Sequence, residues 1–307
     1  MNDMTLCEWF DIWIETYKRR TVKIDTIYTY NELFKVHIAP MLGERRVAEI
    51  RAAEIQKMLN AMADSGYSDG TIELTKTLIK SIFRKAAEDE VADKDPTVHV
   101  ITPKGRRRRE CTVFTKEEQQ IFMEFASVSD LENMFRLAIF TGMRGGELCA
   151  LQWNDVSFEN EMIYVRHTLK SDYKGGYRLD SPKSANSRRE IPMMPQAKLL
   201  LKKMQADRGS NGSYVFQRCG KPITKNNINA ELKRVRNAIS AAGIAFPYFT
   251  MHTTRHTFAT RCIEAGMKPK VLQLILGHSS ITTTMEIYVT VQNAEKALEM
   301  QYVSKAF

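Results

Sequence analysis

Four basic side chains and one phenol are spaced between residues 144 and 288 in a pattern that suits chemistry on phosphodiesters. Arg144 lies in one motif, and His252, Arg255 and His278 lie in a segment that leads to Tyr288. A phosphodiester under attack becomes a doubly negative pentacovalent species, which fixed arginines and histidines can stabilise without a metal ion. A tyrosine within reach of such a cluster is a candidate nucleophile. The combination predicts strand exchange in DNA.

Most of these residues also have a plain structural explanation. Arg144 precedes Glu147 by three positions, so the carboxylate can orient the guanidinium, but such a pair taken alone is more typical of a structural salt bridge. Tyr288 is one of 11 tyrosines, and only its position after the arginines and histidines distinguishes it; Tyr302 is a much weaker candidate. A phenol with a pKa near 10 needs neighbouring cations and a base before it can attack at neutral pH.

Lys183 and the pair His252 and His256 also have both a functional and a structural explanation. Lys183 lies at the tip of a predicted hairpin, from which it could enter a DNA groove and protonate a leaving alkoxide, although a lone lysine on a turn is unremarkable. His252 and His256 are four residues apart, as in the zinc motif H-E-x-x-H, but position 253 is Thr253 and Arg255 between them opposes a cation. We interpret His256 as a core histidine, and we predict neither metal nor other cofactor.

Charge is unevenly distributed along the 307 residues, which are enough for two domains. Residues 1–101 hold 14 Lys and Arg against 17 Asp and Glu, a net charge of −3, and residues 102–307 hold 31 against 19, a net charge of +12. The second part is therefore expected to meet a polyanion, the alternative being a merely solvated basic surface.

The remaining composition favours an intracellular protein. The five cysteines are odd in number and include no C-x-x-C pair, so neither a disulfide framework nor a zinc site is predicted. The N-terminus lacks a signal-peptide pattern, and no apolar stretch is long enough to span a membrane. We expect a cytoplasmic, nucleoid-associated protein with no membrane partner.

Helical periodicity dominates residues 1–92. Helices are predicted over residues 5–18, 25–37 (stopping at Pro40), 52–63 and 68–88, which suits a small helical bundle. On the last helix Lys76, Lys80 and Arg84 form one basic line that could contact DNA phosphates, although a solvated face is the more common explanation.

A basic linker is predicted to follow at residues 93–112. It holds two prolines and a glycine and lacks apolar periodicity. Four consecutive arginines would lie well along a phosphate backbone, with an exposed tether as the alternative: Arg106, Arg107, Arg108 and Arg109.

Residues 113–307 predict a mainly helical α+β domain with one small antiparallel sheet. Thr115-Lys-Glu-Glu118 is a capping box, and strands are expected over residues 162–169, 177–179 and 189–192. Further helices are expected over residues 130–140, 147–152, 195–207, 225–242, 253–265, 268–276, 281–288 and 293–303.

Taken together, four segments resemble the tyrosine recombinase (phage integrase) family. Thr-Gly-Met-Arg144-Gly-Gly-Glu147-Leu resembles its first arginine box, and Ser-Pro-Lys183-Ser resembles its hairpin lysine turn. His252-Thr-Thr-Arg255-His resembles the second box, and Leu-Gly-His278-Ser-Ser with Ile-Tyr288 resembles the nucleophile box. The likeness covers about residues 113–295; Gly145-Gly146 departs from relatives that carry a bulkier residue there, which would loosen the helix start.

The resemblance implies an N-terminal four-helix core-binding (SAM-like) domain at 1–92 and a catalytic domain at 113–307 that ends in a tail helix. It implies that Tyr288 forms a 3′-phosphotyrosine, that Arg144, Arg255 and His278 hold the phosphate, and that Glu147 supports Arg144. Lys183 and His252 would transfer protons. Double-stranded DNA sites, a homotetramer and DNA-bending accessory proteins are the implied partners.

The biological role is left open between classes. We expect integration and excision of a mobile element, with an Xer-type resolvase as the alternative and a type IB topoisomerase or a non-catalytic DNA-binding protein as less favoured ones. The core-binding helices start by Thr5, which leaves no room for an arm-binding domain, so we expect either a simple recombinase of the Xer type or a fragment or short form of a mobile-element integrase. The target sequence and the direction of the reaction are not encoded in any recognisable motif.

Overall fold

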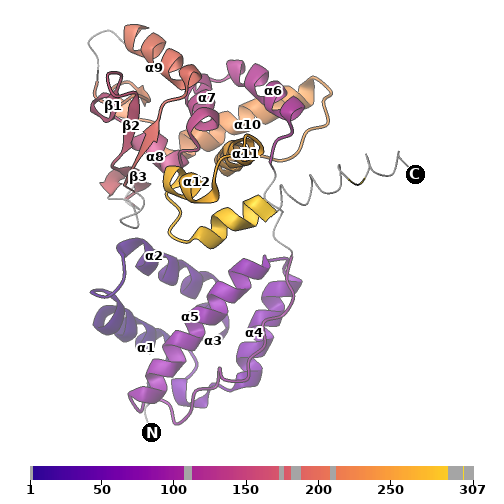
Figure 1. Cartoon of the computed structure of the whole chain (residues 1–307). Coiled ribbons are helices and arrows are strands. Elements are labelled where there is room, and N and C mark those ends of the chain that lie inside the picture. Colours follow the sequence, from indigo (N-terminus) through magenta and orange to yellow (C-terminus); the bar gives the residue numbers. More distant parts are fainter. Residues whose placement is uncertain are drawn as a thin grey trace. The chain divides into compact units, whose positions relative to one another are not determined.

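The computed structural model describes residues 3–106, 113–172, 176–180, 188–207, 212–289 and 300. The chain forms two compact units, Met1–Glu110 and Cys111–Phe307 (Figure 1). Each unit has a hydrophobic core of its own. No helix among the described residues is long and apolar enough to cross a membrane.

The first unit begins with a capped helix, as the sequence predicts. The Thr5 hydroxyl accepts a hydrogen bond from the Glu8 N–H and the Glu8 carboxylate accepts one from the Thr5 N–H, so the start of α1 (Leu6–Trp13) is fixed. The helix continues as a π-helical turn, Ile14–Lys18. Its apolar face carries Trp9, Phe10 and Trp13 into the core.

The second helix does not stop at Pro40, contrary to the prediction. α2 (Ile24–Leu33) passes through a π-helical turn, Phe34–Ile38, into α3 (Ala39–Leu42). Pro40 lies in the first turn of α3, where a missing N–H breaks no intrahelical hydrogen bond. The wider π turn resets the hydrogen-bond register and lets the chain remain helical through the proline.

α4 (Ala52–Asp64) and α5 (Asp69–Glu88) complete the bundle within one residue of their predicted ends, after a short 3₁₀ turn at Val47–Glu49. The Ser68 hydroxyl caps α5 by accepting from the Thr71 N–H. The apolar face of α5 is buried in the first core: Ile72, Leu78, Ile79, Ile82, Phe83 and Ala86.

Residues 93–106, the described part of the predicted linker, pack on the first unit. Gln56 of α4 exchanges two hydrogen bonds with the backbone of Ile101, at 2.8 and 2.9 Å. The Asp69 carboxylate accepts from the Gly105 N–H at 2.6 Å, and Val100 is buried in the core. Arg107 to Arg109 lie outside the described residues, so the predicted domain limits stay a prediction.

The second unit is mainly helical, as predicted, and its helices surround a core rich in phenylalanine (Figure 1). Most of them agree with the predicted spans within two residues. Residues 281–289, the yellow segment after α12, are helical as expected, and the predicted tail helix at 293–303 falls almost wholly outside the described residues. The labelled helices are α6 (Lys116–Phe125), α7 (Glu132–Thr141), α8 (Gly145–Ala150), α9 (Pro195–Asp207), α10 (Lys225–Ala241), α11 (Met251–Glu264) and α12 (Pro269–Leu276).

Where a single sheet is predicted, the described residues form three small antiparallel sheets. β1 (Val156–Ser157), β2 (Met162–Val165) and β5 (Arg189–Pro192) form one in the order β1-β2-β5. β3 (Thr168–Ser171) pairs with β4 (Tyr177–Asp180) in the second. The third joins two-residue strands, β6 (Gln217–Arg218) and β7 (Lys221–Pro222).

The expected strand at 162–169 is thus two strands in different sheets. Ile163, Val165 and Leu169 are all buried and all fall on the same alternation, so the period-2 pattern runs through the break without marking it. Between the two strands Arg166 lies over the Tyr164 ring. Its guanidinium donates to the Asp155 carboxylate at 3.0 Å, which holds the chain at the point where it leaves β2.

Candidate active site

Arg144 is fixed by the start of α8. Helix α7 ends at Gly142, which has a left-handed conformation (φ 63°), and Arg144 then serves as the N-cap of α8. α8 begins at Gly145, two residues before the predicted start. The Glu147 carboxylate accepts from the Arg144 backbone N–H and from its Nη1, both at 2.8 Å. One carboxylate therefore sets both the backbone and the guanidinium of Arg144.

Glu147 has a second partner that the sequence analysis did not include in the site. Arg189, the first residue of β5, donates Nη1 to Oε1 at 3.0 Å and Nη2 to Oε2 at 2.8 Å. The Glu147 and Arg189 side chains are only 3% and 4% exposed. Burial alone would raise the pKa of Glu147, but the hydrogen bonds and charge of Arg189, with the charge of Arg144, lower it to about 2.

A signal for Arg189 was present in the strand pattern. Arg189 and Ile191 are two residues apart, so they share one face of β5, and Ile191 is buried. An arginine on the inward face of a strand requires a buried anionic partner. Glu147 is that partner.

Arg255 is held by backbone carbonyls. It lies in α11, is 3% exposed, and donates Nη1 to the Gly142 carbonyl at 2.8 Å and Nη2 to the Leu276 carbonyl at 2.7 Å. Arg144 donates Nη2 to the neighbouring Gly277 carbonyl at 3.1 Å. Burial, followed by repulsion from Arg144, lowers the pKa of Arg255 to about 9, so it is still a cation at neutral pH. Helix C-terminal carbonyls carry partial negative charge and suit this task.

Two glycines allow these elements to approach one another. A Cβ on Gly142 would lie 2.4 Å from the Phe258 ring, and its positive φ already disfavours a side chain. A Cβ on Gly146 would lie 2.6 Å from Thr168 Oγ1 and 3.1 Å from the Leu169 carbonyl. The Gly145-Gly146 pair, expected to loosen the start of α8, thus also lets β3 pack directly on that helix.

His278 joins the cluster from the end of α12. It follows Gly277, which is also left-handed (φ 65°), and its backbone exchanges hydrogen bonds with Gln273. Its Nδ1 lies 2.9 Å from the hydroxyl of buried Thr284. Burial, with repulsion from Arg255 and Arg144, lowers the pKa of His278 to about 3, so the ring is neutral at pH 7.

His252 and His256 lie near the start of α11. His252 is exposed, and its N–H donates to the Thr250 hydroxyl at 3.1 Å. The two rings meet edge to face with centroids 5.2 Å apart. Burial, together with repulsion from His252 and Arg255, lowers the pKa of partly buried His256 to about 4. Among the described residues no three His, Cys, Asp or Glu side chains gather as metal ligands would.

Tyr288 lies on the helical segment 281–289. Its partly buried ring packs against a small apolar cluster formed by α11 and α12, which includes Phe258 and Leu276. Thr284, the hydroxyl partner of His278, is four residues earlier and therefore on the same face of the segment. The phenol is one helical turn from the histidine contact.

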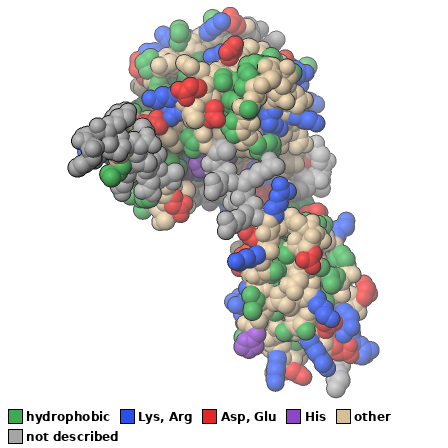
Figure 2. Space-filling view, turned by 90° about the vertical axis from the view of Figure 1, so that its right-hand side faces the viewer, with side chains coloured by type: hydrophobic (Ala, Val, Ile, Leu, Met, Phe, Trp, Pro, Cys, Tyr) green, Lys and Arg blue, Asp and Glu red, His purple; other side chains and the backbone are tan. Residues whose placement is uncertain are grey.

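The other predicted residues are distributed differently. Lys183 falls in the gap at residues 181–187, outside the described part of the chain. On α5, Lys80 and Arg84 are exposed, whereas Lys76 is partly buried and donates to Thr102 at 2.9 Å. The Arg106 backbone forms a bridge with Ser68, and its side chain is exposed. On the face of the first unit visible in Figure 2, basic and acidic side chains are intermixed.

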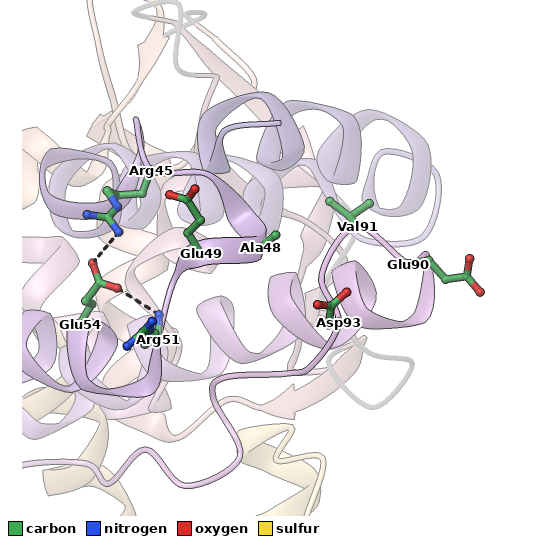
Figure 3. A pocket seen from close by; sticks show the side chains of 8 residues that line it. All are labelled: Arg45, Ala48, Glu49, Arg51, Glu54, Glu90, Val91 and Asp93. Carbon is green, nitrogen blue, oxygen red and sulfur yellow. Dashed lines mark hydrogen bonds and ion pairs between the residues drawn. The ribbon is translucent and has the colours of Figure 1, made fainter. Parts of the chain in front are cut away.

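A hollow of about 930 Å³ in the first unit contains none of the predicted site residues (Figure 3). Its charges are of both signs, and several satisfy one another. The Glu54 carboxylate pairs with Arg45 at 3.5 Å and also accepts from the Arg51 N–H at 3.1 Å. With two arginines against four carboxylates in its lining, the hollow does not offer the positive charge that a phosphate would require.

A helical first unit and a second unit that brings three guanidiniums and a neutral imidazole together have the features expected of a tyrosine-type DNA strand-transfer enzyme. The chain belongs to the phage integrase family: the family model matches residues 112–295, and the model of the phage integrase N-terminal SAM-like domain matches residues 5–63. It is accordingly a tyrosine recombinase, an enzyme that cleaves and rejoins DNA through a tyrosine intermediate.

Relatives include a XerC-like tyrosine recombinase and a transposon transposase. The chain is 28% identical to the tyrosine recombinase XerC-like protein of Caldanaerobacter subterraneus subsp. tengcongensis, over 100% of this chain and 84% of that protein. It is 27% identical to the transposase from transposon Tn916 of Enterococcus faecalis, over 98% of this chain and 78% of that protein.

Solved structures share the fold of both units. The Tn1549 transposon integrase in complex with a circular intermediate DNA superimposes with a TM-score of 0.83 at 26% identity, covering 96% of this chain and 99% of that chain. A lambda integrase tetramer bound to a Holliday junction superimposes with a TM-score of 0.72 at 23% identity, covering 93% and 78%.

Proposed function

We propose that this recombinase integrates and excises a mobile element, with Tyr288 as its nucleophile. The observation that carries the site assignment is the anchoring of Arg144, Arg255 and His278 on the ends of α7, α8 and α12. Each arginine uses only part of its five N–H donors on protein acceptors, so donors are left for a phosphate.

Tyr288 attacks the scissile phosphate, which forms a 3′-phosphotyrosyl ester and releases a 5′-hydroxyl. Arg144, Arg255 and His278 bind the non-bridging oxygens, on which negative charge develops during the attack. A 5′-hydroxyl from a partner strand then attacks the phosphotyrosine and restores the DNA backbone. Because the ester retains the energy of the broken bond, the exchange uses neither ATP nor a metal ion.

The neutral state of His278 suits a hydrogen-bond donor. If the Thr284 hydroxyl donates to Nδ1, the ring carries its single proton on Nε2, where it is free to bind a phosphate oxygen. A low pKa prevents His278 from adding a permanent positive charge beside Arg144 and Arg255. The histidine thus contributes a directed donor.

Proton transfer is assigned to residues at the edge of the cluster. His252, exposed at the start of α11, assists the loss of the phenolic proton of Tyr288. Lys183 is proposed as the general acid that protonates the leaving 5′-oxygen. Glu147 supports Arg144 through the two contacts described above.

The likeness to transposon integrases supports the mobile-element role. Both the Tn916 transposase and the Tn1549 integrase align with nearly the whole chain. The similarity to a XerC-like recombinase keeps Xer-type resolution as the second candidate. Recombination assays separate them, because a resolvase acts on paired sites of one replicon and an integrase joins a circular element to a different target.

A tetramer on two duplexes, located at the nucleoid, completes the proposal. An apolar groove of about 620 Å³ between α7 and α11 is lined by Ile139, Phe140 and Phe258. It suits the tail of a neighbouring copy, residues 293–303, whose sequence includes apolar residues at helical spacing. DNA-bending accessory proteins would help to bring the two sites together.

The test uses a suicide DNA duplex that carries a nick beside the cleavage site, in EDTA. The wild type is expected to form a covalent protein–DNA adduct, and Tyr288→Phe is expected to form none. Tyr302→Phe is the matched control and should react like the wild type. An adduct that persists in Tyr288→Phe would overturn the nucleophile assignment, and no adduct with the wild type would favour a non-catalytic DNA-binding protein.

A further inference from the structure

The charge of the active-site cluster depends on a residue that faces away from solvent. Arg144, Arg189 and Arg255 carry three positive charges, Glu147 carries one negative charge, and the His278 ring is neutral. The cluster therefore has a net charge of +2 (three minus one). This equals in size the charge of a doubly negative pentacovalent phosphate.

We propose that Arg189 is a positioning residue that neutralises Glu147, so that Arg144 offers its full charge and its remaining donors to the scissile phosphate. This inference rests on the proposed function of the cluster. Arg189 acts through Glu147 and Arg144 and does not itself contact DNA.

Two of the three side chains are buried, and the third reaches the surface. Arg189 is 4% exposed, Glu147 is 3% exposed and Arg144 is 35% exposed. Arg189 covers both carboxylate oxygens with two nitrogens, and its Nε donates to the Ile275 carbonyl at 2.5 Å. All three nitrogens of its guanidinium thus donate to protein acceptors, whereas the Arg144 side chain is about one-third exposed.

Arg189 also connects the elements that carry the phosphate ligands. It starts β5, contacts α8 through Glu147, and contacts the last turn of α12 through Ile275. The next carbonyls along α12, those of Leu276 and Gly277, hold Arg255 and Arg144. A change at Arg189 would therefore affect both charge balance and position, and the experiment must separate them.

Without Arg189 the whole charge of Glu147 falls on Arg144. The cluster would then have a net charge of +1, and the carboxylate would compete with the phosphate for the donors of Arg144. Removing Glu147 together with Arg189 restores a net charge of +2. A charge-balance role therefore predicts that a second substitution rescues the first.

The experiment measures the single-turnover rate of adduct formation on the suicide duplex. Arg189→Met is expected to be about 100-fold slower than the wild type, as for the loss of a transition-state donor. The double variant Arg189→Met with Glu147→Gln is expected to recover to within about tenfold of the wild type. Arg218→Met, which removes a half-exposed arginine paired with Asp130, is the control and should react at the wild-type rate.

A second arm replaces the scissile phosphate with a methylphosphonate, which lowers the negative charge of the transition state by one. The penalty of Arg189→Met should then shrink from about 100-fold to less than about tenfold. Arg189→Lys keeps the charge and should show nearly the same penalty on both substrates, so it is the matched control for Arg189→Met in this arm. Arg189→Gln, which is also neutral, replaces the Met variant if that protein does not fold.

Two outcomes would overturn the inference while leaving the proposed function intact. One is a double variant as slow as Arg189→Met, which would mean that Arg189 itself binds the DNA or only maintains the fold. The other is a rate penalty of Arg189→Met that is the same on the phosphate and the methylphosphonate substrates. Absence of an adduct with the wild-type protein would instead contradict the proposed function.

Discussion

Two basic regions of this protein are built in opposite ways. In the second unit the guanidiniums of Arg189 and Arg255 are almost fully buried, and each is bound to fixed acceptors. On the outer side of α5 in the first unit, Lys80 and Arg84 are exposed, and Arg84 has only a loose ion pair with Glu88 at 3.9 Å. Both regions suit a polyanion, but only the buried arginines of the second unit are held in fixed positions.

The difference follows from what each region must do. Stabilising a transition state requires donors that are already oriented, because reorientation during the reaction would cost free energy. Binding a phosphate backbone requires only positive charges that displace counterions, and exposed flexible side chains do this well. A substitution among the buried active-site residues should therefore affect folding and chemistry. A substitution on the exposed side of α5 should affect DNA affinity alone.

The largest expected effect is on folding. Glu147→Ala leaves the buried charge of Arg189 without its anion, and we expect the free energy of unfolding to fall by about 3–5 kcal/mol. Glu88→Ala removes an exposed carboxylate from the α5 region, and should change stability little. Urea unfolding of the full chain, followed by circular dichroism, measures both. Equal losses would contradict the contrast between the regions.

A smaller effect is expected on DNA binding. Replacing both Lys80 and Arg84 by Met should leave stability unchanged, weaken DNA binding by about tenfold, and reduce the salt slope of log K by about 2. Lys76→Met is the comparison within the same helix: because Lys76 donates to Thr102, it should alter the slope less. Binding titrations over a range of salt give the slopes. An unchanged slope in the double variant would show that this face does not meet DNA.

A third effect is the pH dependence of stability. The pKa values of His256 and His278 are lowered from 6.5 to about 4 and about 3 in the folded protein, so the unfolded chain binds more protons between these values. The stability that the two neutral rings contribute is fully present above pH 6.5, and it is lost as the pH falls through their pKa values in the folded protein. The denaturation midpoint should therefore decline from about pH 6.5 downward.

A histidine variant isolates this effect. The double substitution His256→Gln and His278→Gln should flatten the decline between about pH 6.5 and 4.5, and the loss from Glu147 should persist below that, since its pKa is lowered from 4.5 to about 2. His37 in the first unit, whose pKa burial also lowers, is unchanged in this comparison. If the denaturation midpoint of the double variant declines as steeply as that of the wild type, the two histidines do not cause the pH dependence.

Helix limits were largely predictable because their signals are local. Thr5, Ser68 and Thr115 each precede a helix and each accepts the capping hydrogen bond that its type suggests. The prediction that the second helix stops at Pro40 is wrong because the effect of this proline depends on a π-helical turn, which no residue pattern marks. The two-residue strands β6 and β7 are too short to leave a periodic signal.

The structure brings several of the predicted site residues together, whereas the contacts that hold them in place were less predictable. The motifs identify Arg144, Arg255, His278 and Tyr288, and the spacing of Glu147 anticipates its contact with Arg144. The contacts that hold Arg255 come from carbonyls of residues 142 and 276, and backbone acceptors leave no trace in residue type. Arg189 was missed because its burial depends on pairing between β2 and β5, which are far apart in sequence.

The proposed mechanism requires the phenol of Tyr288 to become esterified to DNA. The adduct trapped on the suicide duplex should be digested with trypsin and the DNA-linked peptide identified by mass spectrometry. Residues 271–296 form one tryptic peptide in which Tyr288 is the sole tyrosine, and residues 297–305 form another in which Tyr302 is the sole tyrosine. The account predicts DNA on the first peptide; DNA on the second, or on any peptide without Tyr288, would contradict it.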